Sequence, residues 1–440
     1  MSGMFVHNLG LGARSLRKNP VLTALMVMAI GFGVAASMIT YAVFRAVSGD
    51  PIPQKSSRLF VPLIDNRGPQ YNNEGEPPNA LTYTDAVALM KAHRARHQTM
   101  LYQVGLSVMP QQANRLPFKA VGYATLTDFF TMFDVPFQYG GAWSAADDDA
   151  RSAVVVISRK LNQKLFAGAN SVGREIVLDD QAYRVVGVVE DWDPKPRFFD
   201  MFSGNAYADP SQVYIPFHFA VEHGIETYGN NNCGSDGKRG EGREGWLRGE
   251  CVWISPWVQL DSAAEVAAYR QFLTSYAEDM RHAGRFDWAP NIRLRDVNDW
   301  LDYCHAVPPE SRISLVIAIG FFAICLVNTI GLLLAKFMRR SAEIGVRRAL
   351  GASRGDIYRQ FLAEAGMVGV AGGVLGVLLT GVGMFGVGLV FQPQIARLAH
   401  LDLSLVALSL LVAVFATVVA AFYPTWRAAQ VQPAWQLKSN

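Results

Sequence analysis

The sequence has 440 residues, of which 50% are hydrophobic and 18% are charged, and its formal net charge is only +3. This composition excludes an intrinsically disordered chain, a collagen-like repeat and a disulfide-dense miniprotein. The charged fraction lies below the ~25% typical of globular proteins, which indicates that part of the chain is not in water. Because the net charge is small, we expect no nucleic-acid partner.

Four stretches contain no Asp, Glu, Lys or Arg: 19–44, 313–335, 365–396 and 403–426. Each can hold the ~20 apolar residues that cross a bilayer. We therefore predict four transmembrane helices, over 19–45, 312–336, 365–392 and 403–424. The apolar run of the first helix is longer than the h-region of a signal peptide, so we predict a membrane anchor that is not cleaved.

The distribution of charge predicts the orientation of these helices. The segments 1–18, 336–364 and 427–440 together carry 12 Lys/Arg and three Asp/Glu, whereas 45–312 carries 27 Lys/Arg and 33 Asp/Glu. Basic loops stay in the cytoplasm. We therefore place there an amphipathic N-terminal helix (1–18), the loop 337–364 and the tail 425–440. The domain 46–311 and the short loop 393–402 are expected on the other side.

The inserted segment 46–311 has the mixed pattern of an α+β domain. Periodicity predicts helices over 83–97, 159–166 and 261–283, and strands over 153–157, 175–178, 183–189 and 252–260. Residues 223–250 are rich in Gly, Asn and charge and are expected to form a long loop between Cys233 and Cys251. In an oxidising compartment these two cysteines are disulfide candidates, and two free thiols or a metal-binding pair are the alternatives.

The sequence lacks the signatures of an independent enzyme. It contains no G-x-x-x-x-G-K-[ST], no G-x-S-x-G and no H-E-x-x-H. His93 and His97 have a spacing that could hold a metal, but arginines surround them, and a solvated helix face is the simpler interpretation. We therefore predict no catalytic residue, no metal site and no cofactor on this chain.

The predicted spans hold almost no ionisable group, which argues against a polar channel through them. The third span instead has glycines spaced four apart, namely Gly369 with Gly373 and Gly372 with Gly376. This spacing permits close helix packing. The contact could lie within one subunit or across a dimer, or the glycines could simply be tolerated.

The segment 339–364, RRSAEIGVRRALGASRGDIYRQFLAE, is the most informative part of the sequence. We expect a helix that continues out of the second span and ends at Gly351, because glycine favours the position after a helix. Ser353 and Asp356 then have the spacing of a capping box that starts a second helix. This helix–turn–helix could lie on the membrane, dock into a cleft of another protein, or only anchor the loop in the cytoplasm.

The run EIGVRRALGASRGDIYRQFLAEA within this segment resembles the signature of the MacB/FtsX-type permeases of ABC transporters. The opening NLGLGARSLRKNPVLTAL, residues 165–192 and the final YPTWRAAQVQPAWQLK resemble other parts of that family. The resemblance implies a protein of the bacterial inner membrane, with four spans and a periplasmic core domain between the first two. It also implies a pair of permeases, identical or paralogous, working with two cytoplasmic ATPase subunits that bind ATP and Mg.

In this family the helix after the second span couples the permease to the ATPase. The resemblance assigns that role to Glu343, Arg347, Arg348, Leu350, Gly351 and Ala352. It implies mechanotransmission, in which ATP binding on a separate chain moves the periplasmic domain and expels substrate from the periplasm. We expect export of a peptide, antibiotic or similar amphiphile, with a periplasmic adaptor and an outer-membrane duct as further partners. Lipoprotein release and regulation of a cell-wall hydrolase are the alternatives.

Overall fold

The computed structural model of the chain describes residues 19–70, 74–110, 116–203, 206–234, 241–390 and 403–429. The chain forms two compact units, one over Gly49–Ala306 and the other from Met1–Ser48 together with Val307–Asn440. The predicted N-terminal helix 1–18, the loop 393–402 and most of the tail 425–440 lie outside the described residues.

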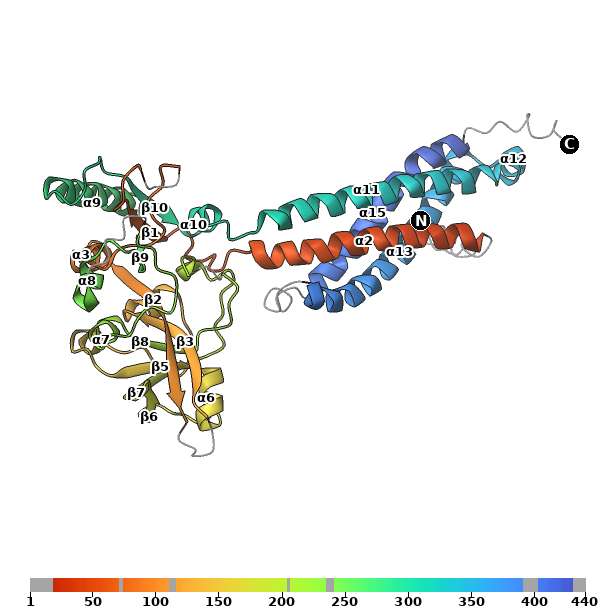
Figure 1. The fold of residues 1–440 in the computed structure, drawn as a ribbon. Coiled ribbons are helices and arrows are strands. Elements are labelled where there is room, and N and C mark those ends of the chain that lie inside the picture. Colours follow the sequence, from red (N-terminus) through yellow and green to blue (C-terminus); the bar gives the residue numbers. More distant parts are fainter. Residues whose placement is uncertain are drawn as a thin grey trace. The chain divides into compact units, whose positions relative to one another are not determined.

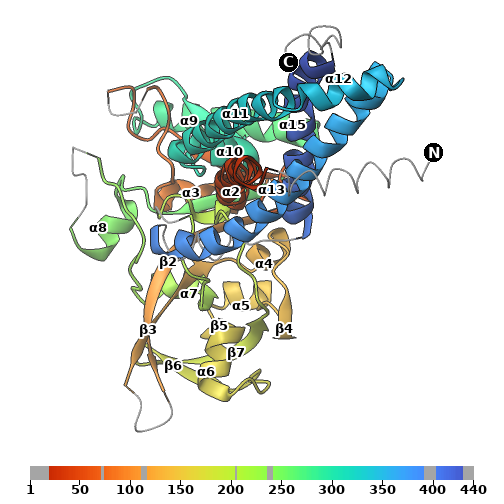
Figure 2. The ribbon, with the colours of Figure 1, turned by 90° about the vertical axis from the view of Figure 1, so that its right-hand side faces the viewer.

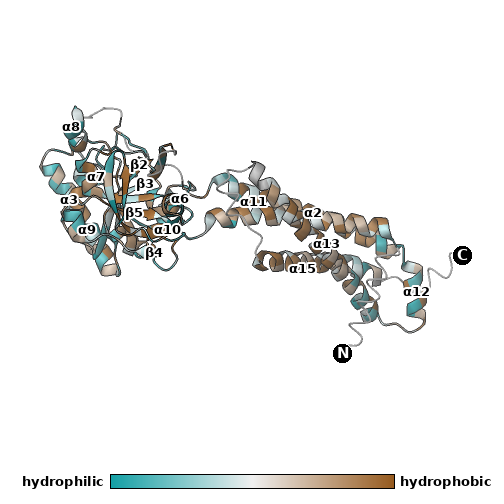
Figure 3. Cartoon of the chain, turned by 90° about the horizontal axis from the view of Figure 1, so that it is seen from below, coloured by the Kyte–Doolittle hydropathy of each residue, from teal (hydrophilic) through white to brown (hydrophobic). Residues whose placement is uncertain are grey.

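The second unit is a bundle of long apolar helices (Figure 1). Its elements are α2 (Pro20–Ser48), α11 (Pro309–Met338), α12 (Ser341–Ala349), α13 (Arg354–Val390) and α15 (Leu403–Ala429). Among the described residues, α2, α11, α13 and α15 are long and apolar enough to cross a membrane. Apolar residues cover most of their length, and more hydrophilic residues gather around α12 (Figure 3). Each predicted span lies on one of these four helices.

One prediction about the loop 337–364 is wrong. α11 does not continue into the next helix, because it ends at Met338 and a turn at Arg339 and Arg340 precedes α12. The second predicted helix forms the start of α13, which runs without a break for 37 residues into the third span. No proline interrupts this stretch.

The four glycines of α13 that were predicted to pack make close contacts inside the bundle. A Cβ atom on Gly372 would lie 2.7 Å from Ile30 Cγ2, and one on Gly376 would lie 2.9 Å from Val34 Cγ1, both in α2. On another side of α13, Cβ atoms on Gly369 and Gly373 would each lie 3.0 Å from an atom of α15. Both spacings therefore serve packing within one subunit, where the missing side chains let the backbones approach.

The unit Gly49–Ala306 is built on a mixed sheet (Figure 2). In its described part, ten strands pair in the order β10-β1-β9-β2-β3-β8-β5-β7-β4, and β6 pairs with β2 and β7. The strands are β1 (Leu59–Ile64), β2 (His97–Met109), β3 (Phe118–Thr125), β4 (Phe137–Gly140), β5 (Val154–Ser158), β6 (Glu175–Leu178), β7 (Gln181–Val189), β8 (Val213–Pro216), β9 (Ser255–Gln259) and β10 (Ile292–Asp296). Among the described strands, only β3–β8 and β5–β7 pair in parallel.

Helices cover the sheet and create two hydrophobic cores. They are α3 (Tyr83–Lys91), α4 (Asp128–Met132), α5 (Ala145–Asp149), α6 (Arg159–Phe166), η1 (Phe198–Asp200), α7 (Phe217–Glu222), α8 (Gly242–Arg248), α9 (Ala263–His282) and α10 (Val297–Tyr303). One core gathers around Tyr102 and Trp253, and the other around Phe129 and Trp257. The predicted α+β class is thus confirmed.

Among the predicted helix ends of this domain, the start of α6 is confirmed and the end of α3 is wrong. Ser158 accepts a hydrogen bond from Leu161 N and starts α6, as its position before the helix predicts. The helix predicted over 83–97 is wrong at its end. It stops at Lys91, and His97 already belongs to β2, where it pairs with Gln259. This helix end is decided by a distant strand and not by local propensity.

The Gly- and Asn-rich segment 223–250 contains a short helix, α8, which the sequence did not predict. Cys233 and Cys251 are joined by a disulfide, with an S–S distance of 2.03 Å. Next to it, Asn232 and Val252 exchange two backbone hydrogen bonds of 3.0 and 2.9 Å. The two ends of the α8 segment are therefore fixed side by side.

Candidate coupling site

The turn between α12 and α13 is closed by backbone and side-chain hydrogen bonds. Gly351 has φ +100°, a conformation that favours glycine, and it donates to the carbonyl of Arg348. Ala352 N donates to Arg347 O, which completes a Schellman motif at the end of α12. Ser353 Oγ accepts from Asp356 N, and Asp356 Oδ2 accepts from Ser353 N, so a capping box begins α13. The sequence predicted both devices.

α12 lies against the bundle with one side and exposes the other. Ile344 is buried in the apolar cluster that also contains Phe337 of α11 and Phe361 of α13, whose ring centroids are 4.2 Å apart. On the exposed side, Val346 is 56% and Leu350 is 83% accessible. Large apolar side chains that remain this exposed at a helix end are suited to a partner surface.

A group of buried charges lies where α2, α11 and α13 meet. Lys336 of α11 is fully buried, and its Nζ is 2.6 Å from Glu364 Oε1 of α13. The same ammonium donates to Thr23 Oγ1 of α2 at 3.3 Å. The second carboxylate oxygen of Glu364 is 3.0 Å from Arg340 in the turn before α12. A carboxylate of 1% exposure is thus shared between two cations.

The charges continue from this buried group onto α12. Arg340 Nε is 3.3 Å from Glu343 Oε2, and Glu343 Oε1 is 2.7 Å from Arg347. Arg347 in turn donates to Gln360 Oε1 of α13 at 2.9 Å. We call the seven residues that make these contacts the ion-pair chain: Thr23, Lys336, Glu364, Arg340, Glu343, Arg347 and Gln360.

The ion-pair chain makes the position of α12 depend on the bundle. Breaking a buried pair on one side leaves an uncompensated charge, which typically costs about 3–5 kcal/mol. If α12 moved alone, Arg340 would have to leave Glu343 or Glu364, and Arg347 would have to leave Gln360. A movement of α12 that keeps these pairs must therefore carry the ends of α11 and α13 with it.

Five of the six predicted coupling residues fall into two groups. Glu343 and Arg347 belong to the ion-pair chain, whereas Leu350, Gly351 and Ala352 form the end of α12 and its turn. Arg348 is half-buried on α12. The prediction missed the other members of the ion-pair chain, namely the buried Thr23, Lys336 and Glu364 and the half-buried Arg340 and Gln360. A signal for two of them existed, since Lys336 and Glu364 directly border uncharged stretches of the sequence.

The other candidate groups do not assemble into a site. His93 follows the end of α3 with φ +46°, and His97 lies in β2 with its Nδ1 3.4 Å from Asp128. Burial raises the pKa of the Cys304 thiol to about 12, so this cysteine is no thiolate at neutral pH. Among the described residues, no group of three or more His, Cys, Asp and Glu side chains could hold a metal.

Four apolar helices, a sheet-rich domain inserted between the first two, and a short amphipathic helix after the second define a class of membrane permease. Residues 23–276 match the MacB-like periplasmic core domain, and residues 315–433 match the FtsX-like permease C-terminal domain. The chain therefore belongs to the MacB/FtsX-like permeases of ABC transporters. Its inserted unit is the periplasmic domain of that family.

Curated relatives are similar over most of the chain. The pyoverdine export ATP-binding/permease protein PvdT of Pseudomonas aeruginosa is 26% identical over 427 residues, which is 96% of this chain and 57% of PvdT. The macrolide export ATP-binding/permease protein MacB of Salmonella paratyphi A is 25% identical over 360 residues, which is 81% of this chain and 48% of MacB. The chain thus spans less than two thirds of the length of these relatives.

Solved structures with a similar domain include the periplasmic region of MacB from Actinobacillus actinomycetemcomitans. The match has a TM-score of 0.37 and 14% identity, and it covers 56% of this chain and 92% of that one. The extracellular domain of the noncanonic ABC-type transporter YknZ from Gram-positive bacteria has a TM-score of 0.33 and 12% identity, over 54% of this chain and 100% of that one.

Proposed function

We propose that the chain is the permease subunit of a mechanotransmission ABC transporter in the bacterial inner membrane. A separate ATPase binds ATP and Mg, contacts α12, and moves the periplasmic domain through the bundle. A second permease, identical or paralogous, completes the membrane part. The cargo is a peptide, antibiotic or similar amphiphile that leaves from the periplasm, with a periplasmic adaptor and an outer-membrane duct as further partners.

The ion-pair chain is the observation that carries this proposal. It links the predicted coupling residues Glu343 and Arg347 to the buried ends of α11 and α13. Exposed Leu350 and Val346 supply the adjoining apolar surface for a partner. Transmission of movement from an ATPase to the bundle requires a docking surface next to a rigid connection between the helices. It does not require a polar pathway across the membrane.

The charge distribution and the relatives support the orientation and the class of cargo. The excess of Lys and Arg around α12 supports a cytoplasmic location for this end of the bundle, and we propose the same side for both termini. PvdT and MacB are both named as export proteins, and the chain matches 96% and 81% of its length to them. We propose the general activity of export for this chain, and we do not assign to it the cargo of either relative.

The test separates docking of the ATPase from transmission of its movement. The permease is purified with its co-expressed ATPase, bound subunits are identified by mass spectrometry, and cargo-stimulated ATP hydrolysis is measured in proteoliposomes. Leu350→Glu changes only the exposed surface and is expected to abolish co-purification. Glu343→Lys disrupts the ion-pair chain and is expected to keep the complex while uncoupling hydrolysis from the periplasmic domain.

Arg359→Glu in the first turns of α13 is the matched charge-reversal control, because Arg359 is exposed and lies outside the ion-pair chain. It should leave both assembly and coupled hydrolysis unchanged. Full coupled activity in Glu343→Lys and in Arg347→Glu would contradict the assignment of the coupling site. If no ATPase co-purified with the wild-type chain, the transporter function itself would be refuted.

A further inference from the structure

A pocket in the periplasmic domain lies between the α8 segment and the residues that follow α7. Its volume is about 490 Å³, which is within the range of ~300–1,000 Å³ usual for small-molecule sites. Apolar lining comes from Ile225, Leu247 and two tryptophans, Trp246 and Trp253. Nothing in the coupling proposal uses this pocket.

The disulfide-closed segment builds one wall of this pocket. Gly242, Arg243, Trp246 and Leu247, which line it, all belong to α8. The segment that carries α8 begins and ends at the Cys233–Cys251 disulfide and at the paired backbones of Asn232 and Val252. A helix of seven residues is marginal on its own, so this closure is what holds the wall in place.

The indole of Trp253 is held rigidly at the back of the pocket. Its ring lies 4.8 Å from Tyr102 in an edge contact and stacks on Tyr83 at 6.4 Å, while Trp246 of α8 is 6.0 Å away. Trp253 is only 5% exposed, and its Nε1–H has no hydrogen-bond partner among the described residues. Because this nitrogen is itself buried, the indole lines the pocket with carbon atoms of its ring.

Charge at the rim complements this aromatic wall. Arg243 of α8 lies close to Gly224 on the opposite side of the pocket, because a Cβ atom on Gly224 would be 3.7 Å from Arg243 Nη1. A guanidinium forms paired hydrogen bonds with a carboxylate. The pocket therefore combines flat aromatic faces with one guanidinium, that of Arg243, and one carboxylate, that of Glu226.

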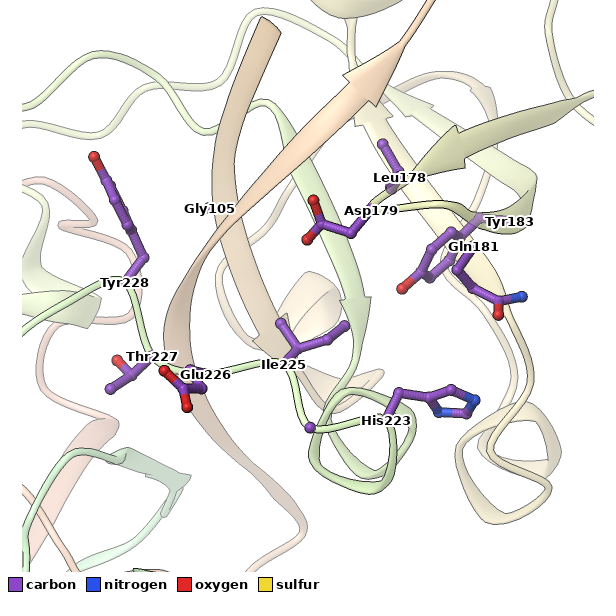
Figure 4. A pocket seen from close by; sticks show the side chains of 11 residues that line it. Gly105, Leu178, Asp179, Gln181, Tyr183, His223, Ile225, Glu226, Thr227 and Tyr228 are labelled. Carbon is purple, nitrogen blue, oxygen red and sulfur yellow. The ribbon is translucent and has the colours of Figure 1, made fainter. Parts of the chain in front are cut away.

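A neighbouring pocket of about 590 Å³ shares the segment Gly224–Thr227 but has a different lining (Figure 4). Asp179, Glu226, Gln181 and Tyr183 make it mainly polar, and Asp179 already accepts a hydrogen bond from Ser107 N. Because it lacks tryptophan and has no cation among its lining residues, this second pocket does not fit the same ligand.

From these features we propose that the pocket between α8 and the segment 221–227 binds a planar aromatic group that carries a carboxylate. The ring packs against Trp246 and Trp253, and the carboxylate pairs with Arg243. The group could belong to a free aromatic acid or to an aromatic residue at the C-terminus of a peptide. Binding is a property of the periplasmic domain and does not depend on an ATPase.

The test uses the full chain in lipid nanodiscs without an ATPase, so its failure is independent of failed coupling. Naphthalene-2-carboxylate is titrated by calorimetry, beside naphthalene-2-methanol, cyclohexanecarboxylate and a tripeptide ending in tryptophan. We expect saturable binding of naphthalene-2-carboxylate, weaker binding of the two partial probes, and a loss of about tenfold in Trp246→Ala. Arg243→Ala should weaken the binding of naphthalene-2-carboxylate about tenfold without changing the binding of naphthalene-2-methanol.

Arg248→Ala on the same helix and Trp192→Phe in the other core are the matched controls, since neither residue lines the pocket. Both should bind as the wild type does. The tripeptide tests whether the natural ligand is the C-terminus of a peptide or a free aromatic acid. A pocket that accepts a peptide terminus should bind the tripeptide as tightly as naphthalene-2-carboxylate, whereas a pocket for a free acid should bind it more weakly. Absence of saturable binding, or equal losses in the controls and the pocket variants, would overturn the proposal.

Discussion

Two groups of buried charge stabilise the two units of this chain in different ways. In the periplasmic domain, Arg285 donates to both oxygens of Asp85 and to both oxygens of Glu250 at 2.6–2.9 Å. In the bundle, Glu364 is shared between the single ammonium of Lys336 and Arg340. A planar guanidinium holds its partners in one geometry, whereas an ammonium on a flexible stem can rotate between acceptors.

This difference matches what each unit has to do. The Arg285 cluster joins α3, the end of the α8 segment and the residues after α9, and Tyr276 donates a further hydrogen bond to Asp85 at 2.8 Å. Of these elements, the α8 segment lines the proposed binding pocket and α3 supports it through the stacking of Tyr83 on Trp253, so both gain from being fixed. The ion-pair chain joins helices that we propose to move together, and its lysine can keep a partner during small displacements. The predictions below test whether the two clusters differ in this way.

Removing the shared carboxylate of the bundle should have the largest effect. Glu364→Met leaves Lys336 and Arg340 facing each other in a buried site, and we expect a loss of about 3–5 kcal/mol in the free energy of unfolding. The double variant Lys336→Met/Glu364→Met should recover most of that loss but not coupled ATP hydrolysis. Denaturation with SDS in mixed micelles, followed by circular dichroism, measures the stability of both variants, with the exposed Glu310→Met as control. Coupled ATP hydrolysis is measured in proteoliposomes. Unchanged stability in Glu364→Met would contradict the importance of the buried pair.

A third buried carboxylate, Asp148 in the periplasmic domain, has N–H donors and no cation. It accepts from Trp143 Nε1 and Thr127 N, each at 2.8 Å, but burial raises its pKa to about 6. Between about pH 4 and 6 the folded protein keeps this proton while the unfolded chain has lost it. The free energy of unfolding should therefore fall as the pH rises through this window, by up to ~3 kcal/mol.

Urea unfolding of the wild type and of Asp148→Asn between pH 4 and 7, followed by tryptophan fluorescence, isolates this contribution. The difference in stability between the two proteins should move in favour of the asparagine variant as the pH rises. A difference that moved the other way would mean that the two N–H donors outweigh burial and that Asp148 stays ionised.

The sequence predicted the features that depend on neighbouring residues and missed those that depend on distant ones. Uncharged stretches identified the four long helices, and Gly351 with the Ser353–Asp356 pair identified the capped turn, because both signals are local. The pairing of Lys336 with Glu364 required helix ends to meet in space, and Asp85 and Arg285 are 200 residues apart. The end of α3 was mispredicted for the same reason, since the strand that competes with it pairs with residues far along the chain.

Replacing the guanidinium of Arg285 by an ammonium group tests the rigid cluster of the periplasmic domain directly. Arg285→Lys keeps the charge but loses the paired hydrogen bonds to Asp85 and Glu250, and we expect the domain to lose about 2 kcal/mol. Arg281→Lys, in the exposed pair with Glu278, is the matched control and should be nearly neutral. Both are measured by urea unfolding of the full chain. Equal effects would indicate that the geometry of the buried fork contributes little.

The smallest effect is expected where the bundle uses shape and not charge. Gly372→Ala places a methyl group 2.7 Å from Ile30 Cγ2, so α13 and α2 must separate slightly, at a cost of about 1–2 kcal/mol. Gly386→Ala in the same helix meets nothing within 4 Å, and alanine favours a helix, so this control should be neutral or slightly stabilised. SDS denaturation again compares the two. If Gly372→Ala also left coupled hydrolysis intact while Glu343→Lys abolished it, close packing would hold the bundle together and the ion-pair chain alone would transmit movement.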